Sequence, residues 1–473
     1  MNQREVQHLF WRAGFGESLA VIKAFEGKSA KKVFAALKKD SEKFRRIDIV
    51  SWGEVMAELK QLKDLSDKND PNANKERQKK LVQDRKEEHA TLNTTWVDLM
   101  VGGGAFREKM ALFWHGVLVA RSINPAFSQS YLNTIRENAL GKFGDLLMAV
   151  SKEPAMLQFL NNQQNRKRSP NENFAREVME LFTLGRGNYS EKDIKEAARA
   201  FTGWSFRPLK AEFEFREEWH DDGEKTIFGK TGNFKGEDVI ELILSKRQTA
   251  KFITTKIYKF FINDTPNQEI INDLAKRFYE SEYDISQLME HIFTSNWFYD
   301  EQNIGSKIKS PIELLVGIQR GLGVRFEEKQ PLLFTQKVLG QVLLFPPNVA
   351  GWASGQSWID SSSLLFRMEL PLMILKNSTI NVAAKDDGDV GTTFMNKRGR
   401  TFAAEVDWDS YIKKLKADKP NELVQEASQY LLQIPVNQTF LKGFENKIKT
   451  EDREEAIKQA TLGLMMLPEY QLC

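Results

Sequence analysis

The sequence predicts a mainly α-helical protein of many helices, with a long charged helical arm near its amino end and one small β-hairpin insertion near 211–229. Three observations predict this fold class. Apolar residues recur at helical spacing through most of the 473 residues. Interleaved charges run from Glu54 to Leu99, which is typical of solvated helices. Alternation of period two is confined to a short stretch around Phe213 and Phe215.

Composition excludes several classes of protein. Hydrophobic residues make up 41% of the chain and charged residues 28%, as in ordinary globular proteins. Lys and Arg number 68 against 65 Asp and Glu, so the concentrated basic charge of a nucleic-acid binder is missing. The single cysteine, Cys473, excludes an intramolecular disulfide framework and a cysteine-clustered zinc site. No apolar run reaches the length of a membrane span, and no signal-peptide pattern opens the chain, so we expect a cytoplasmic protein.

The length favours more than one structural unit. We expect an N-terminal helical region with the charged arm at 1–100. A central helical domain with the hairpin insertion follows at 101–372. A loop and C-terminal helices that pack on the central domain complete the chain at 373–473.

The segment from Phe106 to Arg121 is predicted to form a buried helix, because apolar residues cover its whole circumference. His115 lies on this helix, and Glu108 lies about two turns earlier on the same side. One interpretation is a general acid or base, or a metal ligand, oriented by Glu108. The plainer alternative is a core histidine whose nitrogens find partners.

The segment Asn173–Leu184 is predicted to be a helix with a narrow polar stripe, followed by a second helix that begins at Ser190 and ends near Gly203. Carboxylates three residues apart lie on neighbouring turns and can face one ligand. We therefore propose Glu177 and Glu180 as catalytic, and Arg176 as a substrate-binding residue that also holds Glu180 ionised and leaves Glu177 freer to act as a base. Substrate-binding amides are expected nearby, since these side chains are fixed donors and acceptors: Asn162, Asn165 and Asn173. An ordinary solvated stripe is the alternative.

The turn that begins at His220 brings an imidazole, an acid and an amine together on a hairpin whose strands are expected at 213–215 and 226–228. His220 is a candidate proton shuttle, and Asp221 and Lys225 are candidate substrate-binding residues. The alternative is a polar turn with a structural role only.

A Gly-containing loop carries Trp352 and Trp358. Flat aromatic faces stack on sugar or peptide groups, so Trp352 is a candidate substrate-binding residue. The alternative is a loop that closes the helical core.

Seven segments in a fixed order resemble the bacterial family called domain of unknown function 1800, over nearly the whole chain. They are HLFWRAGFG from His8, ALFWHGVLVAR from Ala111, PAMLQFLNNQQN from Pro154, the helix pair from Asn171 to Trp204, HDDGEKTIFGKTGNFKGEDVIELIL from His220, PPNVAGWASGQSWI from Pro346, and LPEYQLC at the end of the sequence. The resemblance implies a largely helical fold and no settled activity. It also implies a partner, because many members are encoded beside a protein similar to sulfatases and alkaline phosphatases.

The chain departs from the family pattern at two positions. Members often carry a second histidine where this chain has Val117, and an aspartate where it has Asn161. Both changes remove metal ligands that the resemblance would imply. The metal and the cofactor are therefore unknown.

These observations favour an enzyme that performs acid–base chemistry, with or without a metal, on a polar or anionic small molecule or glycan; hydrolysis is the reaction class we keep in view. Its pocket would lie where the His115 helix, the Glu177 helix and the His220 hairpin converge. The alternative is a non-catalytic binding or assembly partner of a sulfatase-like or phosphatase-like protein, which would use the charged arm and the Trp352 loop. No nucleic acid and no membrane span are expected.

Overall fold

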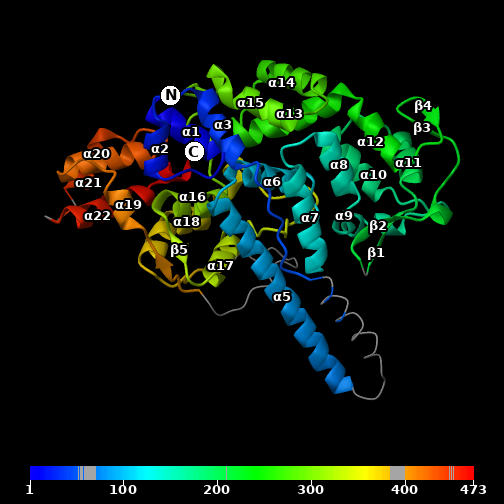
Figure 1. Cartoon of the computed structure of the whole chain (residues 1–473), viewed down its shortest axis with the longest axis horizontal. Coiled ribbons are helices and arrows are strands. Elements are labelled where there is room, and N and C mark those ends of the chain that lie inside the picture. The colour runs from blue at the N-terminus through cyan, green and yellow to red at the C-terminus, as the bar shows by residue number, and fades with distance from the viewer. Residues whose placement is uncertain are drawn as a thin grey trace.

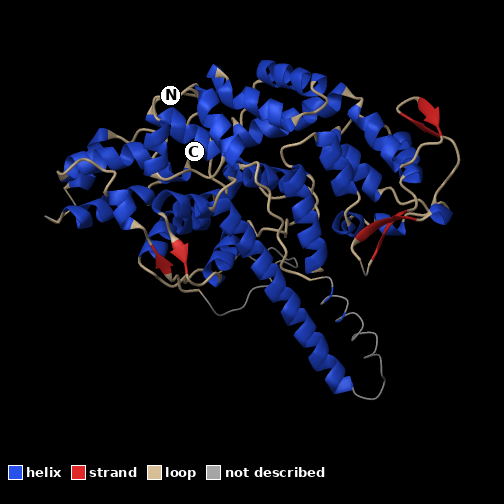
Figure 2. Cartoon of the chain, in the orientation of Figure 1, coloured by secondary structure: helices blue, strands red, loops and turns tan. Residues whose placement is uncertain are grey.

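The computed structural model describes residues 1–51, 53, 57, 71–208, 210–383, 400–446, 448, 450 and 452–473. Helices make up most of this part of the chain, and its strands form three two-stranded sheets (Figure 1, Figure 2). The predicted mainly α-helical fold is confirmed.

The amino-terminal helices are α1 (Gln3–Ala13), α2 (Leu19–Phe25) and α3 (Ala30–Asp40). A capping box at Asn2 starts α1. The next long helix, α5 (Pro71–Val101), has 31 residues and projects from the body (Figure 1). Its carboxyl-terminal part is buried, whereas most residues from 75 to 80 are exposed. The structure thus confirms a helical arm over 71–101; the rest of the predicted arm, except for residue 57, lies outside the described residues.

The centre of the molecule is α6 (Ala105–Val117), which is buried almost all round, as its apolar circumference predicts. It packs against α1, α3, α5 and α7 (Pro125–Asn138). Two helices then continue from α7 into the neighbouring part of the fold, α8 (Phe143–Ser151) and α9 (Pro154–Phe159).

The segment predicted as one regular helix changes its winding halfway. α10 (Asn173–Glu177) leads into a π-helical turn, η2 (Val178–Thr183). Leu184 N donates to Met179 O, five residues earlier, at 2.8 Å. The wider turn rotates the residues of η2 away from the positions that an α-helix would give them. The following helix, α11 (Glu191–Ala200), starts at a Ser190 capping box as predicted.

The strand pairing predicted for the insertion is wrong. β2 (Glu212–Phe215) pairs with β1 (Trp204–Arg207), and β3 (Lys225–Ile227) pairs with β4 (Lys230–Gly232). The insertion therefore contains two hairpins instead of one. The first forms because β1 buries its side chains from Trp204 to Phe206. The second closes through positive φ angles at Phe228 and Gly229, which suit a tight turn.

The remaining helices are α12 (Gly236–Leu244), α13 (Arg247–Phe261), α14 (Gln268–Glu280), α15 (Ile285–Thr294), α16 (Pro311–Leu322), α17 (Gln330–Leu339), α18 (Ser361–Leu375), α19 (Trp408–Ile412), α20 (Pro420–Leu431), α21 (Gln438–Glu445) and α22 (Arg453–Met465). The third sheet joins β5 (Arg325–Phe326) to β6 (Ala404–Glu405). Short 3-10 turns occur at Asn162–Gln164, Glu217–Trp219, Asn296–Tyr299, Gly355–Trp358 and Pro468–Gln471.

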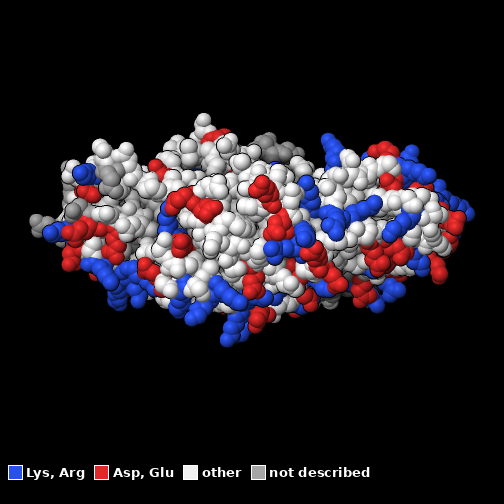
Figure 3. Space-filling model, turned by 90° about the horizontal axis from the view of Figure 1, so that it is seen from above, with Lys and Arg blue, Asp and Glu red and all other residues white. Residues whose placement is uncertain are grey.

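One hydrophobic core extends from Val6 in α1 to Tyr470 near the end of the chain. It includes residues from all three predicted domain segments, whose boundaries stay a prediction. Within the described residues, no helix has both the length and the apolar character needed to cross a membrane. Lys and Arg are interspersed with Asp and Glu over the face seen in Figure 3.

Candidate functional site

Glu180, predicted to be catalytic, binds two residues of the loop between η2 and α11. Its carboxylate accepts hydrogen bonds from the hydroxyl of Tyr189 at 2.5 Å and from Arg186 Nη2 at 2.7 Å. These two hydrogen bonds lower the pKa of Glu180 below its ordinary value. Since Arg186 and Tyr189 both lie between η2 and α11, the carboxylate ties that connection to the helix before it.

Arg176 does not hold Glu180, contrary to the sequence prediction. Its two terminal nitrogens donate to the two carboxylate oxygens of Glu191, both at 2.8 Å, and one of them also donates to Glu172 at 3.2 Å. This paired geometry suits a guanidinium, and the π-helical turn carries Glu180 away from it. Arg176 therefore joins α10 to α11.

Glu177 differs from its neighbours. Its side chain is half-buried, and it makes no hydrogen bond or ion pair within the described part of the chain. Burial, followed by the negative charge of Glu180, raises the pKa of Glu177. Of the two predicted catalytic carboxylates, only Glu177 is free to meet a ligand.

The predicted substrate-binding asparagines hold a loop in place. Asn165 Nδ2 donates to Ala198 O at 2.8 Å, and Asn165 Oδ1 accepts from the main-chain N–H of Asn171. Asn162 Nδ2 donates to two main-chain oxygens at the end of α11 and the start of β1, each at 3.4 Å. Asn173 Nδ2 donates to Leu160 O at 3.0 Å. The structure brings these amides together, and it uses their hydrogen-bonding groups internally.

The His220 turn is also bound internally. His220 is buried, and its Nδ1 lies 2.8 Å from Thr202 O. Asp221 forms an ion pair with Arg199 at 2.7 Å, and that guanidinium lowers the pKa of Asp221. Lys225 is 1% exposed, and its Nζ donates to Asp221 O, Gly223 O and Asn233. In this arrangement Lys225 supports the turn rather than reaching a ligand.

His115 lies between two indole rings. The ring centroids of Trp96 and Trp352 lie 5.5 Å and 5.1 Å from that of His115, with interplanar angles of 30° and 29°. Neither imidazole nitrogen has a hydrogen-bond partner within the described residues. Burial lowers the pKa of His115 to about 4, so the ring is neutral at pH 7.

Glu108 does not orient His115, which corrects the predicted pairing. Its carboxylate accepts from Arg136 Nη2 at 2.7 Å and from Trp96 Nε1 at 2.9 Å. A buried carboxylate is stabilised best by a cation and further donors, and an imidazole is the weaker partner. Glu108 therefore acts on His115 only through the ring of Trp96.

The predicted site residues fall into two groups. Those on α10, α11 and the adjacent hairpins are joined by the contacts above, and His115 contacts Trp352. No described hydrogen bond, ion pair or ring contact links His115 with Glu177 or His220. Figure 1 places α6 at the centre of the molecule and α11 toward one end. Their convergence on one pocket stays a prediction that these contacts do not support.

A cavity with a volume of about 790 Å³ lies beside α6, α13 and the Trp352 loop. Gly351 docks this loop against α6: a Cβ atom there would lie 2.7 Å from Gly116 O. Aromatic residues line part of the cavity: Phe113, Phe260, Trp352 and Trp358. Charged residues line another part: Lys256, Lys259, Asp264, Lys307 and Glu313. Trp352 is the sequence-predicted binding residue that belongs to this set.

Two of the cavity's lysines differ in their contacts. Lys307 Nζ donates to Asp264 Oδ1 and to Lys259 O, both at 2.5 Å. Lys256 has no carboxylate partner within the described residues. Burial, then the charge of Lys259, lowers the pKa of Lys256 to about 8. Sequence reasoning missed Lys256, because it lies in an ordinary amphipathic helix that carries other lysines.

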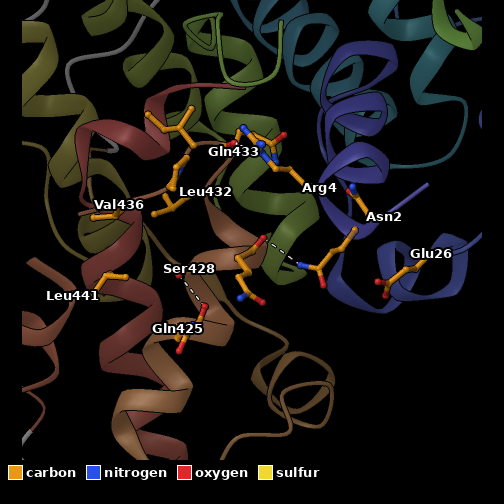
Figure 4. Close-up of a pocket in the computed structure, with 13 residues that line it drawn as sticks. Asn2, Arg4, Glu26, Gln425, Ser428, Leu432, Gln433, Val436 and Leu441 are labelled. Atoms are coloured by element: carbon orange, nitrogen blue, oxygen red, sulfur yellow. Dashed lines mark hydrogen bonds between the residues drawn. The ribbon is translucent and has the colours of Figure 1, made fainter. Parts of the chain in front are cut away.

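A second cavity, of about 520 Å³, lies between the start of α1 and the region of α20 and α21 (Figure 4). Its lining is rich in amides, which bond to nearby main-chain groups, as Gln3 does to Gln429 O. Arg4 is held by Glu301 and by Gln433 O. No aromatic side chain lines it among the described residues.

Within the described residues, no group of three or more His, Cys, Asp or Glu side chains is arranged to hold a metal ion. Comparison with curated proteins and with solved structures finds no match to this chain. Residues 8–472 match the family described as "Protein of unknown function (DUF1800)". The match covers nearly the whole sequence, as the seven ordered segments predict, and the chain therefore belongs to this family.

Proposed function

We propose that the protein is an enzyme that performs acid–base chemistry on a polar or anionic small molecule in the cavity beside α6 and α13. The observation that carries this proposal is a cavity of about 790 Å³ that combines aromatic walls with a lysine whose pKa is about 8. Small-molecule sites commonly have this size and this mixture of apolar wall and few polar groups. Ionisable groups with shifted pKa values in a cavity are typical of active sites.

Lys256 is the acid–base group of this proposal. A pKa of about 8 leaves roughly a tenth of the amine unprotonated at pH 7, so it can accept a proton and return it. No carboxylate of the described part of the protein holds Lys256, so its amine is available to exchange a proton with a bound ligand. We propose hydrolysis as the reaction class, with water entering the open cavity.

The aromatic wall fits a ligand with a flat or ring-shaped part. Trp352 and Trp358 line the cavity, and His115 stacks on the face of Trp352. We assign His115 a positioning role, since burial keeps its ring neutral and neither of its nitrogens has a partner. Glu177, Glu180 and His220 stay proposals for catalysis, and Glu177 suits this role best because its carboxylate makes no hydrogen bond or ion pair within the described residues.

The test is an activity screen with chromogenic esters of phosphate, sulfate, carboxylate and simple sugars, repeated with the Lys256→Met variant. We expect turnover of one class by the unaltered protein and a loss of at least 100-fold in kcat for the variant. Lys251→Met is the matched control, because Lys251 is an exposed lysine on the same helix. Equal turnover by the protein and the Lys256→Met variant would refute the proposal.

The second candidate function is a binding or assembly partner of a sulfatase-like or phosphatase-like protein. The projection of α5 from the body favours it (Figure 1). Val82 on this helix is 50% exposed, and lysines and arginines surround it. Size-exclusion chromatography of the protein mixed with the protein encoded beside it would test this function. Co-elution that the Val82→Asp variant abolishes would support it, and separate elution would refute it.

A further inference from the structure

We infer that the cavity beside α6 and α13 holds its ligand through an anionic group, such as a phosphate, a sulfate or a carboxylate, bound by Lys256 and Lys259. This inference rests on the proposed function and narrows its substrate class. It is carried by the excess of positive charge in the cavity lining, to which buried cations bound to the lining loop add.

The first observation is the charge balance of the lining. Both acids of the lining already have cationic partners: Asp264 binds Lys307, and Glu313 binds Lys109. Lys256 and Lys259 have no carboxylate partner within the described residues. The two lysines lie three residues apart on α13, where side chains share one face. Two lysines on one face of a helix that lines a cavity raise the positive potential there and favour an anion.

The second observation lies behind the cavity wall. The loop from 303 to 310 supplies part of the lining, and two buried guanidinium groups that do not line the cavity bind this loop. Arg12 Nη2 donates to Asn303 O at 2.7 Å and to Ser306 Oγ at 3.1 Å. Arg367 Nη2 donates to Lys309 O.

These guanidinium groups are not fully bonded. Arg12 Nε, Arg12 Nη1 and Arg367 Nη1 are buried without an acceptor within the described residues. An unpartnered buried donor is unfavourable, and more so when the group is charged.

Cations outnumber anionic groups around this loop. The buried cations are Arg12, Lys109, Lys307, Lys309 and Arg367. The carboxylates that act on them are those of Asp264 and Glu313. Burial, as the main cause, lowers the pKa of Lys309 to about 7 and that of Arg367 to about 10. An anion in the cavity would supply the missing negative charge and would favour the charged forms of these groups.

The two sides of the cavity then have separate roles. The lysine side binds the anionic group, and Trp352 and Trp358 pack against the apolar or ring-shaped remainder of the ligand. A phosphorylated or carboxylated sugar has both parts. A neutral sugar has only the second, so it should bind more weakly.

The experiment is isothermal titration calorimetry of the full chain with inorganic phosphate, sulfate, citrate, glucose 6-phosphate and glucose. We expect glucose 6-phosphate to bind at least tenfold more tightly than glucose, and at least one of the inorganic or carboxylate anions to compete with it. The Lys256→Met/Lys259→Met variant should lose at least tenfold in affinity. Neither side chain forms an ion pair within the described residues, so this variant should fold, which its circular dichroism and melting temperature verify.

The exposed lysine of the same helix supplies the matched control, Lys251→Met, which should bind like the unaltered protein. Three results would overturn the inference: no anion binds, the double variant binds as well as the unaltered protein, or the control variant loses affinity equally. The proposed function fails separately. Anion binding without turnover of any ester would support the anion site and refute the proposed enzymatic activity. Turnover of a neutral ester without anion binding would support the activity and refute the anion site.

Discussion

Two regions of the molecule are rich in polar side chains, and they use them in opposite ways. In the region of α10, α11 and the adjacent hairpins, Asn165, Asp221 and Lys225 bind main-chain groups or one another. In the cavity beside α6 and α13, Lys256 has no carboxylate partner, and Arg12 behind the wall has donors without acceptors. The first region uses most of its polar groups internally, with Glu177 and His220 Nε2 left without a partner among the described residues, and the second has capacity left for a ligand. Density of polar residues in a sequence is therefore a weaker sign of a site than unsatisfied polar groups in a structure.

The largest effect in the cavity region is expected from removing one partner of the buried ion pair between Lys109 and Glu313. Lys109→Met leaves Glu313 buried without its cation, and the free energy of unfolding should fall by about 3–5 kcal/mol. Lys109→Met/Glu313→Gln should lose less, because no uncompensated charge stays behind. Urea unfolding followed by circular dichroism measures both variants; a loss below about 1 kcal/mol for the single change would show that the pair is dispensable.

Acid should destabilise the protein through its buried histidines. The pKa of His115 and that of His89 are lowered to about 4, chiefly by burial, so the folded protein keeps both rings neutral while the unfolded chain protonates them below pH 6.5. Their contribution to stability is present above pH 6.5 and is lost as the pH falls towards 4. Each loss is about 3 kcal/mol by pH 4. In the His115→Phe variant, the fall in stability from pH 7 to pH 4 should be smaller by that amount, as urea unfolding at several pH values would measure; an unchanged fall would contradict the burial of His115.

Substitutions at Asn165 and at Lys256 should affect different properties: the first lowers the stability of the protein, and the second lowers its affinity for the ligand. Asn165→Ala removes the bonds to Ala198 O and to the N–H of Asn171, so we expect a loss of about 1–3 kcal/mol and unchanged affinity for glucose 6-phosphate. Lys256→Met should lower the affinity for glucose 6-phosphate and leave the stability of the protein unchanged. Melting temperature and calorimetry on the same preparations make the comparison. A loss of ligand affinity in the Asn165→Ala variant would indicate that the two regions form one site, contrary to this prediction.

The smallest effect is expected at Glu177. Burial raises its pKa, so its ionised form is disfavoured in the folded protein and slightly destabilises it at pH 7. Glu177→Gln should therefore stabilise the protein at pH 7, by no more than about 0.5 kcal/mol. The gain should vanish as the pH falls through the raised pKa, because the native carboxyl group is then neutral too. A stability loss at pH 7 would indicate an ion pair or hydrogen bond that Glu177 makes in solution.

Much of the fold could be predicted from the sequence. The period of apolar residues predicts α6 as a buried helix, and the Ser190 capping box predicts the start of α11. The strand pairing could not be predicted, since β1 is a short apolar segment without alternation and pairs because its side chains enter the core. The π-helical turn after Glu177 leaves no pattern in the residues themselves.

The site was harder to predict than the fold. The sequence identifies Trp352, because an aromatic residue in a Gly-containing loop is conspicuous. It does not identify Lys256 or Arg12, whose distinction lies in the partners that they lack. Whether a lysine has a carboxylate beside it depends on the packing of segments far apart in the chain, as the binding of Lys307 to Asp264 illustrates. Only the folded chain contains that information.

The π-helical turn of Val178–Thr183 has a consequence for the length of the chain. Such a turn holds one residue more than an α-helix needs for the same rise. A chain without one of these residues would wind through this segment as an ordinary helix, and the loop before α11 would keep its position. Relatives can therefore differ in length by one residue here and still superpose on either side of the difference.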